Sequence, residues 1–314
     1  ARGGGSSPLS GTMQKVLVIL GPTASGKSAL GVKLAKKFKG EIISADSRQV
    51  YKGLDKGTGK ITKKEMQGVP HYLLDVADPK KYFSVSEYKT LALKILQYTG
   101  VNNKLPIIVG GTGFYIDALT GSVSLPEVPP NKLLRRKLER LKVEKLFAML
   151  KKKDPRRAKE IDPRNKVRII RALEIVGALG KVPKIKSAPS PYKFIFIGLK
   201  PEQKELEEKI YKRIWNRLYG MIHEARKLHM QGLSYARMET LGLEYRYLAR
   251  LLQKKITKAE FIEQLYAETK KYSKRQYAWF KRNKKIKWFT MRGVEGFEPK
   301  EYKKIETEVR NMLG

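Results

Sequence analysis

The stretch VLVILGPTASGKS, residues 16–28, decides the fold. Its first five residues are an apolar run typical of a buried strand, and helical spacing of apolar residues follows over residues 28–38. The pattern G-x-x-x-x-G-K-S stands between them, and its glycines let backbone N–H groups curl around phosphate oxygens at the start of a helix. This context favours a phosphate-binding loop over a chance glycine-rich turn. We expect Lys27 to reach a terminal phosphate and Ser28 to hold Mg²⁺. The predicted loop comprises Gly21, Pro22, Thr23, Ala24, Ser25, Gly26, Lys27 and Ser28.

Apolar strands alternate with helical segments after this loop. Further strands are predicted over residues 41–45, 106–109, 194–199 and 286–290, with helices over residues 84–98 and 114–119 and long helices from about 202 to 281. A strand–helix–strand rhythm of this kind is typical of a parallel sheet with helices on both faces. The sequence therefore predicts an α/β fold with a parallel sheet like that of the P-loop NTPases.

The composition and the hydrophobic pattern of the sequence change near Gly121. Residues 122–130 hold three prolines, and residues 131–180 show only helical patterns that are dense in Lys and Arg. We therefore predict an all-α, basic insertion over residues 122–192, inside an α/β core formed by residues 13–121 and 193–314. Residues 1–12 are rich in Gly and Ser, and we interpret them as a flexible tail or a tag remnant.

The charge of the chain is strongly unbalanced. Lys and Arg number 67 against 30 Asp and Glu, a net charge of +37, of which the predicted insertion carries +13. A field of this strength favours a polyanionic partner, with nucleic acid ahead of an anionic membrane surface or an unusual composition. The apolar runs are too short to cross a bilayer. Because there is no cysteine, disulfides, thiol nucleophiles and Cys-based metal sites are excluded.

Two polar loops should lie beside the phosphate loop, since the carboxyl ends of parallel strands meet at one edge of a sheet. Asp46 follows the second predicted strand and could be a Mg²⁺-linked carboxylate, a general base or a helix cap. The run GGTG at residues 110–113 follows the third strand. It either offers a hydroxyl and N–H groups to the same crevice or forms a tight turn.

A basic and aromatic motif, KRQYAWFK, stands at residues 274–281. Such a mixture suits phosphate contacts with base stacking, although Tyr277 and Phe280 could equally be core residues below a solvated charged face. His71, His223 and His229 show no metal-ligand spacing, so we interpret them as structural or exposed.

Taken together, the motifs resemble one family, the tRNA dimethylallyltransferases, also called tRNA isopentenyltransferases. The similar stretches, in family order, are GPTASGKS (21–28), ISADSRQVYKGLDKGTGK (43–60), HYLLDVADP (71–79), GGTGFYIDAL (110–119), RIIRALEI (168–175), LGLEYRYL (241–248) and KRQYAWFK (274–281). The eukaryotic type carries a Cys/His zinc finger, so a chain without cysteine resembles the bacterial type. One departure is Gly242-Leu243, where many bacterial members have Gly-Tyr.

The resemblance implies transfer of a dimethylallyl group from dimethylallyl pyrophosphate to N6 of the adenosine just 3′ of the anticodon, position 37, in tRNAs that read codons beginning with U. The phosphate loop would then hold pyrophosphate, clamped by Arg213 and Arg217. Thr23 would contact the bridging or leaving oxygen, Lys27 would stabilise the leaving charge, and Asp46 would accept the N6 proton.

The resemblance also implies a tRNA anticodon stem-loop as partner, gripped by the basic insertion, and a monomer that acts in the cytoplasm without a membrane. The tRNA-binding positions that it implies are Asp46, Ser47, Arg48, Gln49, Thr112, Arg135, Val167, Arg168, Ile169, Ile170, Arg171, Lys274, Arg275, Gln276, Trp279 and Lys281.

Three other functions compete with this one. An adenylate isopentenyltransferase would modify free AMP, ADP or ATP and would not need the basic insertion or the basic aromatic tail. A small-molecule P-loop kinase would not explain the GGTGFYIDAL and KRQYAWFK motifs. An RNA-binding P-loop protein that uses nucleotide as a switch leaves Asp46 and Thr23 without a chemical task.

Overall fold

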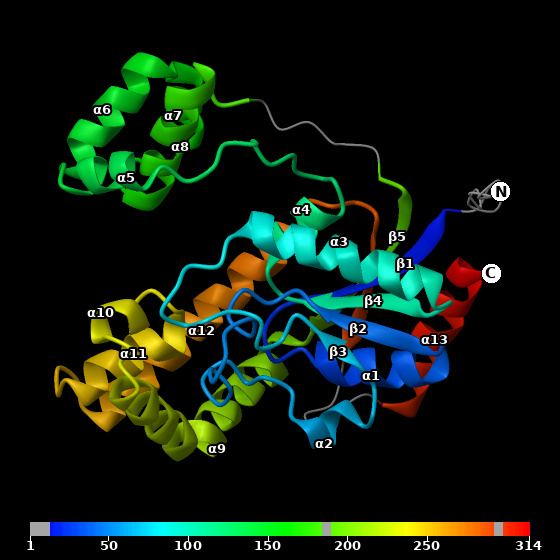
Figure 1. The fold of residues 1–314 in the computed structure, drawn as a ribbon. Coiled ribbons are helices and arrows are strands. Elements are labelled where there is room, and N and C mark those ends of the chain that lie inside the picture. Colours follow the sequence, from blue (N-terminus) through cyan, green and yellow to red (C-terminus); the bar gives the residue numbers. More distant parts are fainter. Residues whose placement is uncertain (1–12, 184–189, 292–297) are drawn as a thin grey trace, which may run out of the picture. The chain divides into compact units, whose positions relative to one another are not determined.

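The computed structural model describes residues 13–183, 190–291 and 298–314. Within them, one parallel sheet has the strand order β3-β2-β4-β1-β5-β6 (Figure 1). Its strands are β1 (Gln14–Leu20), β2 (Gly40–Ser44), β3 (His71–Tyr72), β4 (Leu105–Gly110), β5 (Tyr192–Pro201) and β6 (Ile286–Met291). The predicted parallel sheet is confirmed, and every neighbouring strand pair is parallel.

Strand β1 lies in the interior of the sheet, where Leu17 pairs with Ile107 of β4 and with Ile195 of β5. Its residues are apolar on both faces because both faces are covered. Val16 and Val18 belong to one buried cluster, while Leu17 and Ile19 belong to another. This explains why the strand reads as a continuous apolar run and not as an alternating one.

Two layers of helices cover the sheet (Figure 1). The first layer, with the larger of the two clusters, contains α3 (Val85–Val101), α4 (Gly113–Leu119), α9 (Gln203–Met230), α10 (Tyr235–Met238), α11 (Leu243–Leu252) and α12 (Lys258–Phe280). The second layer contains α1 (Lys27–Lys37) and α13 (Pro299–Leu313), which buries Ile305 and Val309 against the strands. A short helix, α2 (Lys63–Met66), lies in the connection between β2 and β3.

Helix ends follow local capping chemistry. Ser84, the residue that starts the predicted helix at 84–98, accepts the N–H of Glu87 at 3.2 Å in a capping box, and the helix continues to Val101. Three elements were not predicted. Helix α2 has only four residues and strand β3 only two, too few for a periodic signal, and α13 carries just two buried apolar residues among charged ones.

The chain divides into two compact units, Ala1–Thr120 with Pro189–Gly314, and Gly121–Ala188. We call them the core unit and the insertion unit. The insertion unit contains α5 (Lys132–Glu139), α6 (Val143–Lys153), α7 (Pro155–Glu160) and α8 (Lys166–Leu179), packed around its own apolar cluster. The predicted tail, residues 1–12, lies outside the described residues.

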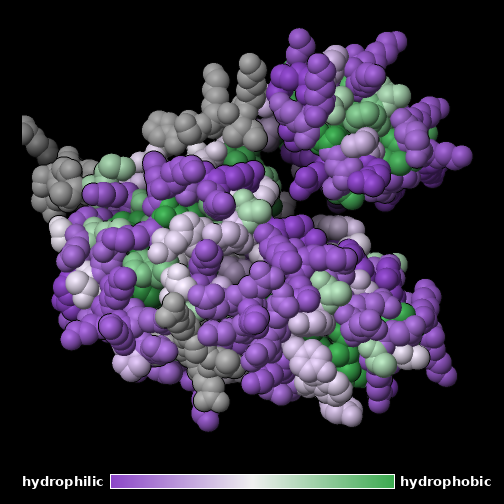
Figure 2. Space-filling view, turned by 180° about the vertical axis from the view of Figure 1, so that it is seen from behind, coloured by the Kyte–Doolittle hydropathy of each residue, from purple (hydrophilic) through white to green (hydrophobic). Residues whose placement is uncertain are grey.

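Most of the surface in view in Figure 2 is hydrophilic, with small hydrophobic patches between the polar side chains. Among the described residues, no helix combines the length and the apolar character needed to cross a membrane.

Candidate functional site

The phosphate loop connects β1 to α1 through two glycines with positive φ. Gly21 has φ +150°, and a Cβ there would stand 2.7 Å from the carbonyl oxygen of Leu199. Gly26 has φ +85° immediately before α1 begins at Lys27. The Lys27 ammonium folds back over the loop and donates to the carbonyl oxygen of Pro22 at 2.5 Å. The loop therefore has the curled backbone that the motif predicts, with its cation inside the curl.

The electrostatics of Lys27 show what surrounds it. Burial lowers the pKa of its ammonium to about 7, with the carboxylate of Asp46 acting in the opposite direction and the guanidinium of Arg213 lowering it further. Both groups are therefore close enough to Lys27 to act on it. The crevice combines a carboxylate and an arginine beside the phosphate loop.

Asp46 begins the turn that follows β2. Its Oδ1 accepts the N–H groups of Arg48 and Gln49 at 2.8 and 3.3 Å, so the helix-cap interpretation describes one of its oxygens. In the described residues, Oδ2 accepts no protein hydrogen bond. A half-buried carboxylate that is oriented by one oxygen keeps the other available as a base.

Thr112 joins the ends of β2 and β4. Its hydroxyl oxygen accepts the N–H of Ser47 at 3.0 Å, and its own N–H donates to the carbonyl oxygen of Ala45 at 3.1 Å. Gly110 permits this approach, because a Cβ there would lie 2.2 Å from that same carbonyl oxygen. The tight-turn interpretation of the GGTG run therefore holds, and the Thr112 hydroxyl and N–H that could have faced the crevice bind Ser47 and Ala45 instead.

Arg213 and Arg217 come from one face of α9, one turn apart. Arg213 donates from Nη1 to Thr23 Oγ1 at 3.2 Å and from Nη2 to the carbonyl oxygen of Thr58 at 3.0 Å. Arg217 donates from Nη1 to the carbonyl oxygen of Lys56 at 2.7 Å. Burial, together with the charge of Arg213, lowers the pKa of Arg217 to about 10. Two guanidinium groups held beside one another in this way favour an anion with several charges.

A small pocket lies between these arginines and the loop. One part of its wall is polar and charged, and another is apolar. Its lining residues are Thr23, Ala24, Ile210, Arg213, Ile214, Arg217, Glu244 and Thr269. Its volume is only about 10 Å³, roughly the space of one water molecule, so it marks the edge of the arginine site and does not enclose a ligand.

The residues of the KRQYAWFK motif (274–281), at the end of α12, have different roles. Lys274, Arg275 and Lys281 are exposed, as expected of phosphate contacts. Gln276, predicted to touch tRNA, is buried instead: its Oε1 accepts the N–H of Thr23 and its Nε2 donates to the carbonyl oxygen of Gly111, each at 2.8 Å. In this structure the amide ties α12 to the two strand-end loops, and the direct tRNA contact of Gln276 stays a prediction.

The aromatic residues of the motif are also partly structural. Trp279 donates from Nε1 to Asp117 at 2.9 Å and carries the guanidinium of Arg282 at 4.1 Å from its ring centroid. Tyr277 packs edge-on against Trp288, with ring centroids 5.1 Å apart, and Phe280 is buried. The core interpretation therefore holds for Phe280.

The insertion unit presents only part of its predicted tRNA strip. Val167 is 79% exposed and Arg168 is exposed, but Ile169 and Ile170 are 0% and 6% exposed. The side chains of these two isoleucines are therefore not at the surface, where a tRNA contact would need them. On a helix, successive residues point in different directions, and this pair faces the core of the unit.

Arg135 and Arg171 converge on one buried carboxylate, that of Glu174. Arg135 donates to it from Nε and Nη2 at 2.9 and 2.8 Å, and Arg171 donates from Nη1 at 2.5 Å. Burial acts to raise the pKa of Glu174, but these hydrogen bonds and the N–H of Asn131 outweigh it and hold the pKa at about 2. The two arginine side chains remain about one-third exposed, at 38% and 34%, and their guanidinium groups are held in place by the carboxylate of Glu174.

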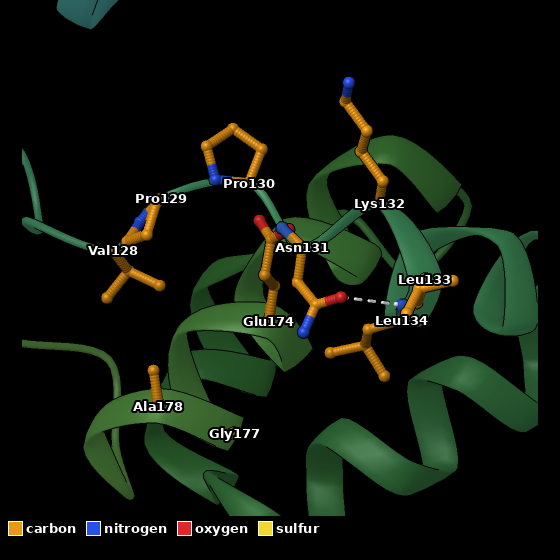
Figure 3. Close-up of a pocket in the computed structure, with 10 residues that line it drawn as sticks. All are labelled: Val128, Pro129, Pro130, Asn131, Lys132, Leu133, Leu134, Glu174, Gly177 and Ala178. Atoms are coloured by element: carbon orange, nitrogen blue, oxygen red, sulfur yellow. Dashed lines mark hydrogen bonds between the residues drawn. The ribbon is translucent and has the colours of Figure 1, made fainter.

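Glu174 also borders a hollow of the insertion unit, and Figure 3 shows its carboxyl group beside Asn131, whose side-chain oxygen accepts the N–H of Leu134 at 2.9 Å. The hollow is lined by Val128, Pro129, Pro130, Asn131, Lys132, Leu133, Leu134, Glu174, Gly177 and Ala178.

The histidines lie apart from these sites. His71 contacts the carbonyl oxygen of Val69 through Nδ1 at 2.8 Å, and burial lowers its pKa. His229 stacks on Tyr235 with ring centroids 3.9 Å apart. Within residues 13–183, 190–291 and 298–314, no group of three or more His, Asp or Glu side chains gathers to hold a metal ion.

Sequence reasoning missed Glu224 and Tyr245. Glu224 binds the backbone of residues 55–57, which lie more than 160 positions earlier in the chain. Nothing in the spacing of the sequence links these segments. The only local signal was the pair Gly57 and Gly59, whose missing side chains leave room for Tyr245 and for the two arginines.

Comparisons with known proteins agree with this geometry. The family model for IPP transferase matches residues 49–283. A tRNA dimethylallyltransferase of Anoxybacillus flavithermus is 40% identical over 291 residues, which cover 91% of this chain and 93% of the relative. One of Thermoanaerobacter pseudethanolicus is 40% identical over 299 residues, covering 90% and 94%.

Solved structures similar to this chain belong to the same group of enzymes. The crystal structure of the tRNA isopentenylpyrophosphate transferase of Bacillus halodurans is similar with a TM-score of 0.73 and 36% identity, covering 96% of this chain and 97% of that one. A eukaryotic dimethylallyltransferase acting on tRNA has a TM-score of 0.77 and 26% identity, covering 88% and 74%. Since the family model spans well over half of the chain and the relatives align over nearly all of it, the chain belongs to the tRNA dimethylallyltransferase (IPP transferase) family of transferases.

Proposed function

We propose that this protein transfers a dimethylallyl group from dimethylallyl pyrophosphate to N6 of adenosine 37, next to the anticodon, in tRNAs that read codons beginning with U. The observation that carries the proposal is the environment of Lys27. The charges of Asp46 and Arg213 act on it from the same crevice, so a base and an anion clamp lie close together. Prenyl transfer to an amine uses both groups, since the clamp stabilises the departing pyrophosphate and the base accepts the N6 proton.

The reaction exchanges one bond for another. The N6 lone pair forms a bond to C1 of the dimethylallyl group while the bond from C1 to the pyrophosphate oxygen breaks, and the electron pair leaves with pyrophosphate. The N6 proton passes to the carboxylate of Asp46. Lys27, Arg213 and Arg217 stabilise the charge that develops on the leaving group, and Thr23 lies within hydrogen-bond distance of Arg213 at its edge.

The residues beside α9 are compatible with a prenyl donor. Arg213 and Arg217 would take the pyrophosphate, and Ala24, Ile210 and Ile214 are the apolar residues next to that site.

Mg²⁺ fits the phosphate loop as a substrate-bridging ion. Ser28 is exposed at the start of α1, so its hydroxyl could be one ligand, with phosphate oxygens and waters as the others. Mg²⁺ in proteins usually binds substrate phosphates and waters together with few protein ligands, so the site does not require several carboxylate side chains. The bound ion would neutralise part of the negative charge of the pyrophosphate.

The partner that we propose is the anticodon stem-loop of tRNA, bound by a monomer in the cytoplasm. The Asp46–Gln49 strip would hold the adenine, which must leave the base stack to reach Asp46. Exposed groups such as Arg168, Lys274 and Lys281 would contact phosphates, and these contacts position the RNA without reading its sequence.

Incubation with dimethylallyl pyrophosphate, Mg²⁺ and unmodified tRNA, followed by mass spectrometry of the nucleosides, tests this function. We expect one adenosine in susceptible tRNAs to gain a dimethylallyl group. Transfer to free AMP with none to tRNA would identify an adenylate isopentenyltransferase instead. ATP consumption with phosphorylation of a small molecule, and no prenyl transfer, would identify a kinase.

A further inference from the structure

The loop from Asp55 to Gly59 lies between a buried carboxylate and the arginine pair. It is folded tightly on itself: the Thr58 hydroxyl donates to the carbonyl oxygen of Leu54 at 2.6 Å, and the Lys60 N–H donates to that of Asp55 at 3.0 Å. The Lys60 ammonium, with a side chain only 5% exposed, bridges Asp55 and Asp75. Because these contacts fix the shape of the loop, a movement of its backbone at one end would also move its other end.

One side of the loop is held by Glu224 of α9. The carboxylate accepts three successive backbone N–H groups, those of Asp55 and Lys56 on Oε2 at 2.9 and 2.7 Å and that of Gly57 on Oε1 at 2.9 Å. The hydroxyl of Tyr245, a fully buried residue of α11, donates to Oε1 at 2.5 Å. Hydrogen bonds to an ionised acceptor are roughly twice as strong as neutral ones, so four of them fix the loop firmly.

The other side of the loop aims the arginines. The carbonyl oxygen of Lys56 accepts from Arg217, and that of Thr58 accepts from Arg213. The loop backbone lies directly against both guanidinium groups, because a Cβ on Gly59 would lie 2.2 Å from Arg213 Nη2 and 2.4 Å from Arg217 Nη1. On the Glu224 side, a Cβ on Gly57 would lie 2.6 Å from the Tyr245 ring.

We propose that Glu224 and Tyr245 are positioning residues that hold the loop at residues 55–59, so that its carbonyl groups direct Arg213 and Arg217 at the anion bound by the phosphate loop. Neither residue touches the anion. The identity of that anion as pyrophosphate rests on the proposed function, whereas the coupling between Glu224 and the two guanidinium groups does not. The negative charge of Glu224 also offsets the repulsion between the two arginines, and it acts on the pKa of Arg217 in the upward direction.

The test compares two Glu→Gln variants of the whole chain. Glu224→Gln keeps the shape of the side chain but turns an NH₂ group toward backbone N–H donors. Glu260→Gln is the matched control, because Glu260 also accepts a backbone N–H, that of Thr257 at 2.7 Å, in the capping box of α12. Melting temperature, inorganic pyrophosphate affinity by calorimetry, and the KM for dimethylallyl pyrophosphate against kcat are measured for both.

We expect Glu224→Gln to weaken pyrophosphate binding by at least about ten-fold and to raise the donor KM, with Tyr245→Phe acting less strongly in the same direction. Glu260→Gln should change the melting temperature little, since glutamine also serves in a capping box, and should leave pyrophosphate affinity within about two-fold. Equal losses of affinity in Glu224→Gln and Glu260→Gln, or unchanged affinity in Glu224→Gln, would overturn the proposal.

A second measurement separates this proposal from the proposed function. The Nε–H NMR signals of Arg213 and Arg217, assigned with Arg213→Lys and Arg217→Lys, report the guanidinium environment without any ligand. Glu224→Gln should shift both signals and speed their hydrogen exchange, while Glu260→Gln should not. If the parent protein binds no pyrophosphate, the proposed function fails, and the arginine signals alone decide: signals unmoved by Glu224→Gln contradict the positioning role.

Discussion

The proposed chemistry depends on a single oxygen atom of Asp46. Its Oδ1 is used by two backbone N–H groups, which leaves Oδ2 to take the N6 proton. We expect Asp46→Ala to lower the rate of dimethylallyl transfer by about 10²- to 10⁴-fold, the usual contribution of a general base. Single-turnover kinetics with saturating tRNA measures it.

The dissociation constant of tRNA should stay within about two-fold in Asp46→Ala, since phosphate contacts dominate RNA affinity. Asp46→Asn, which keeps both N–H acceptor interactions on one oxygen, should be nearly as inactive. Activity close to that of the parent protein in either variant would remove Asp46 from the role of base.

Lys27 links pyrophosphate binding to pH. Its pKa in the free protein is about 7, so at pH 8 most molecules hold a neutral amine there, and at pH 6 most hold an ammonium. A bound polyanion favours the ammonium. Binding should therefore take up close to one proton at Lys27 at pH 8 and almost none at pH 6, and the affinity should fall as pH rises above 7.

Calorimetry of pyrophosphate binding in two buffers of different ionisation enthalpy measures this uptake. Lys27→Arg is the control, because a guanidinium stays charged throughout this range. Protonation of pyrophosphate itself is common to both proteins, so only the difference between them belongs to Lys27. The same uptake by both proteins at pH 8 would show that Lys27 is charged before the anion arrives.

Helix α12 contributes to the crevice in a way that the motif KRQYAWFK does not reveal. The buried amide of Gln276 pairs with the Thr23 N–H and the Gly111 carbonyl group. We expect Gln276→Leu to lower the free energy of unfolding by about 1–3 kcal/mol, because a buried donor and acceptor lose their partners. It should also weaken pyrophosphate binding and leave tRNA affinity nearly unchanged.

Lys274→Gln supplies the comparison, since Lys274 is exposed on the same helix and should show the opposite pattern: weaker tRNA binding with unchanged stability. Urea unfolding and filter binding of tRNA separate the two variants. Should Gln276→Leu lose tRNA affinity as strongly as Lys274→Gln, Gln276 would regain the direct contact that the sequence suggested.

At the level of elements, the sequence could predict what short-range patterns encode. The strand–loop–helix around Lys27 has a motif, and Ser47, next to Asp46, meets Thr112 because parallel strands place their carboxyl ends at one edge. It could not predict which side of a helix faces which neighbour. The burial of Gln276, Ile169 and Ile170 depends on tertiary packing, and within one motif a contact residue and a core residue look alike.

For the whole molecule, the net charge of +37 makes non-specific attraction of any polyanion a serious alternative to a defined tRNA surface. Two double variants with equal charge change distinguish them. Lys166→Ala with Arg168→Ala removes two cations at the start of α8, at and beside the tRNA-binding positions predicted over residues 167–171. Lys63→Ala with Lys64→Ala alters exposed lysines of α2, outside any predicted contact.

We expect the α8 pair to weaken tRNA binding several-fold and to reduce the slope of log affinity against log salt by up to about 2, close to one for each phosphate that is no longer neutralised. The α2 pair should change both quantities much less. Equal effects from the two pairs would mean that the insertion unit attracts RNA only through the overall field.

The hydrogen bond between Thr23 and Gln276 joins residues 253 positions apart. Ribosomes add about 5–20 residues each second, so the phosphate loop of a growing chain waits roughly 13 to 50 seconds for this partner to be made. During that interval the β1 strand and its loop exist without α12, and Arg213 arrives 190 positions after Thr23. A chain that ends before α12 would keep the phosphate-loop motif but lack the Gln276 amide that binds Thr23, so we expect premature termination there to yield an inactive product.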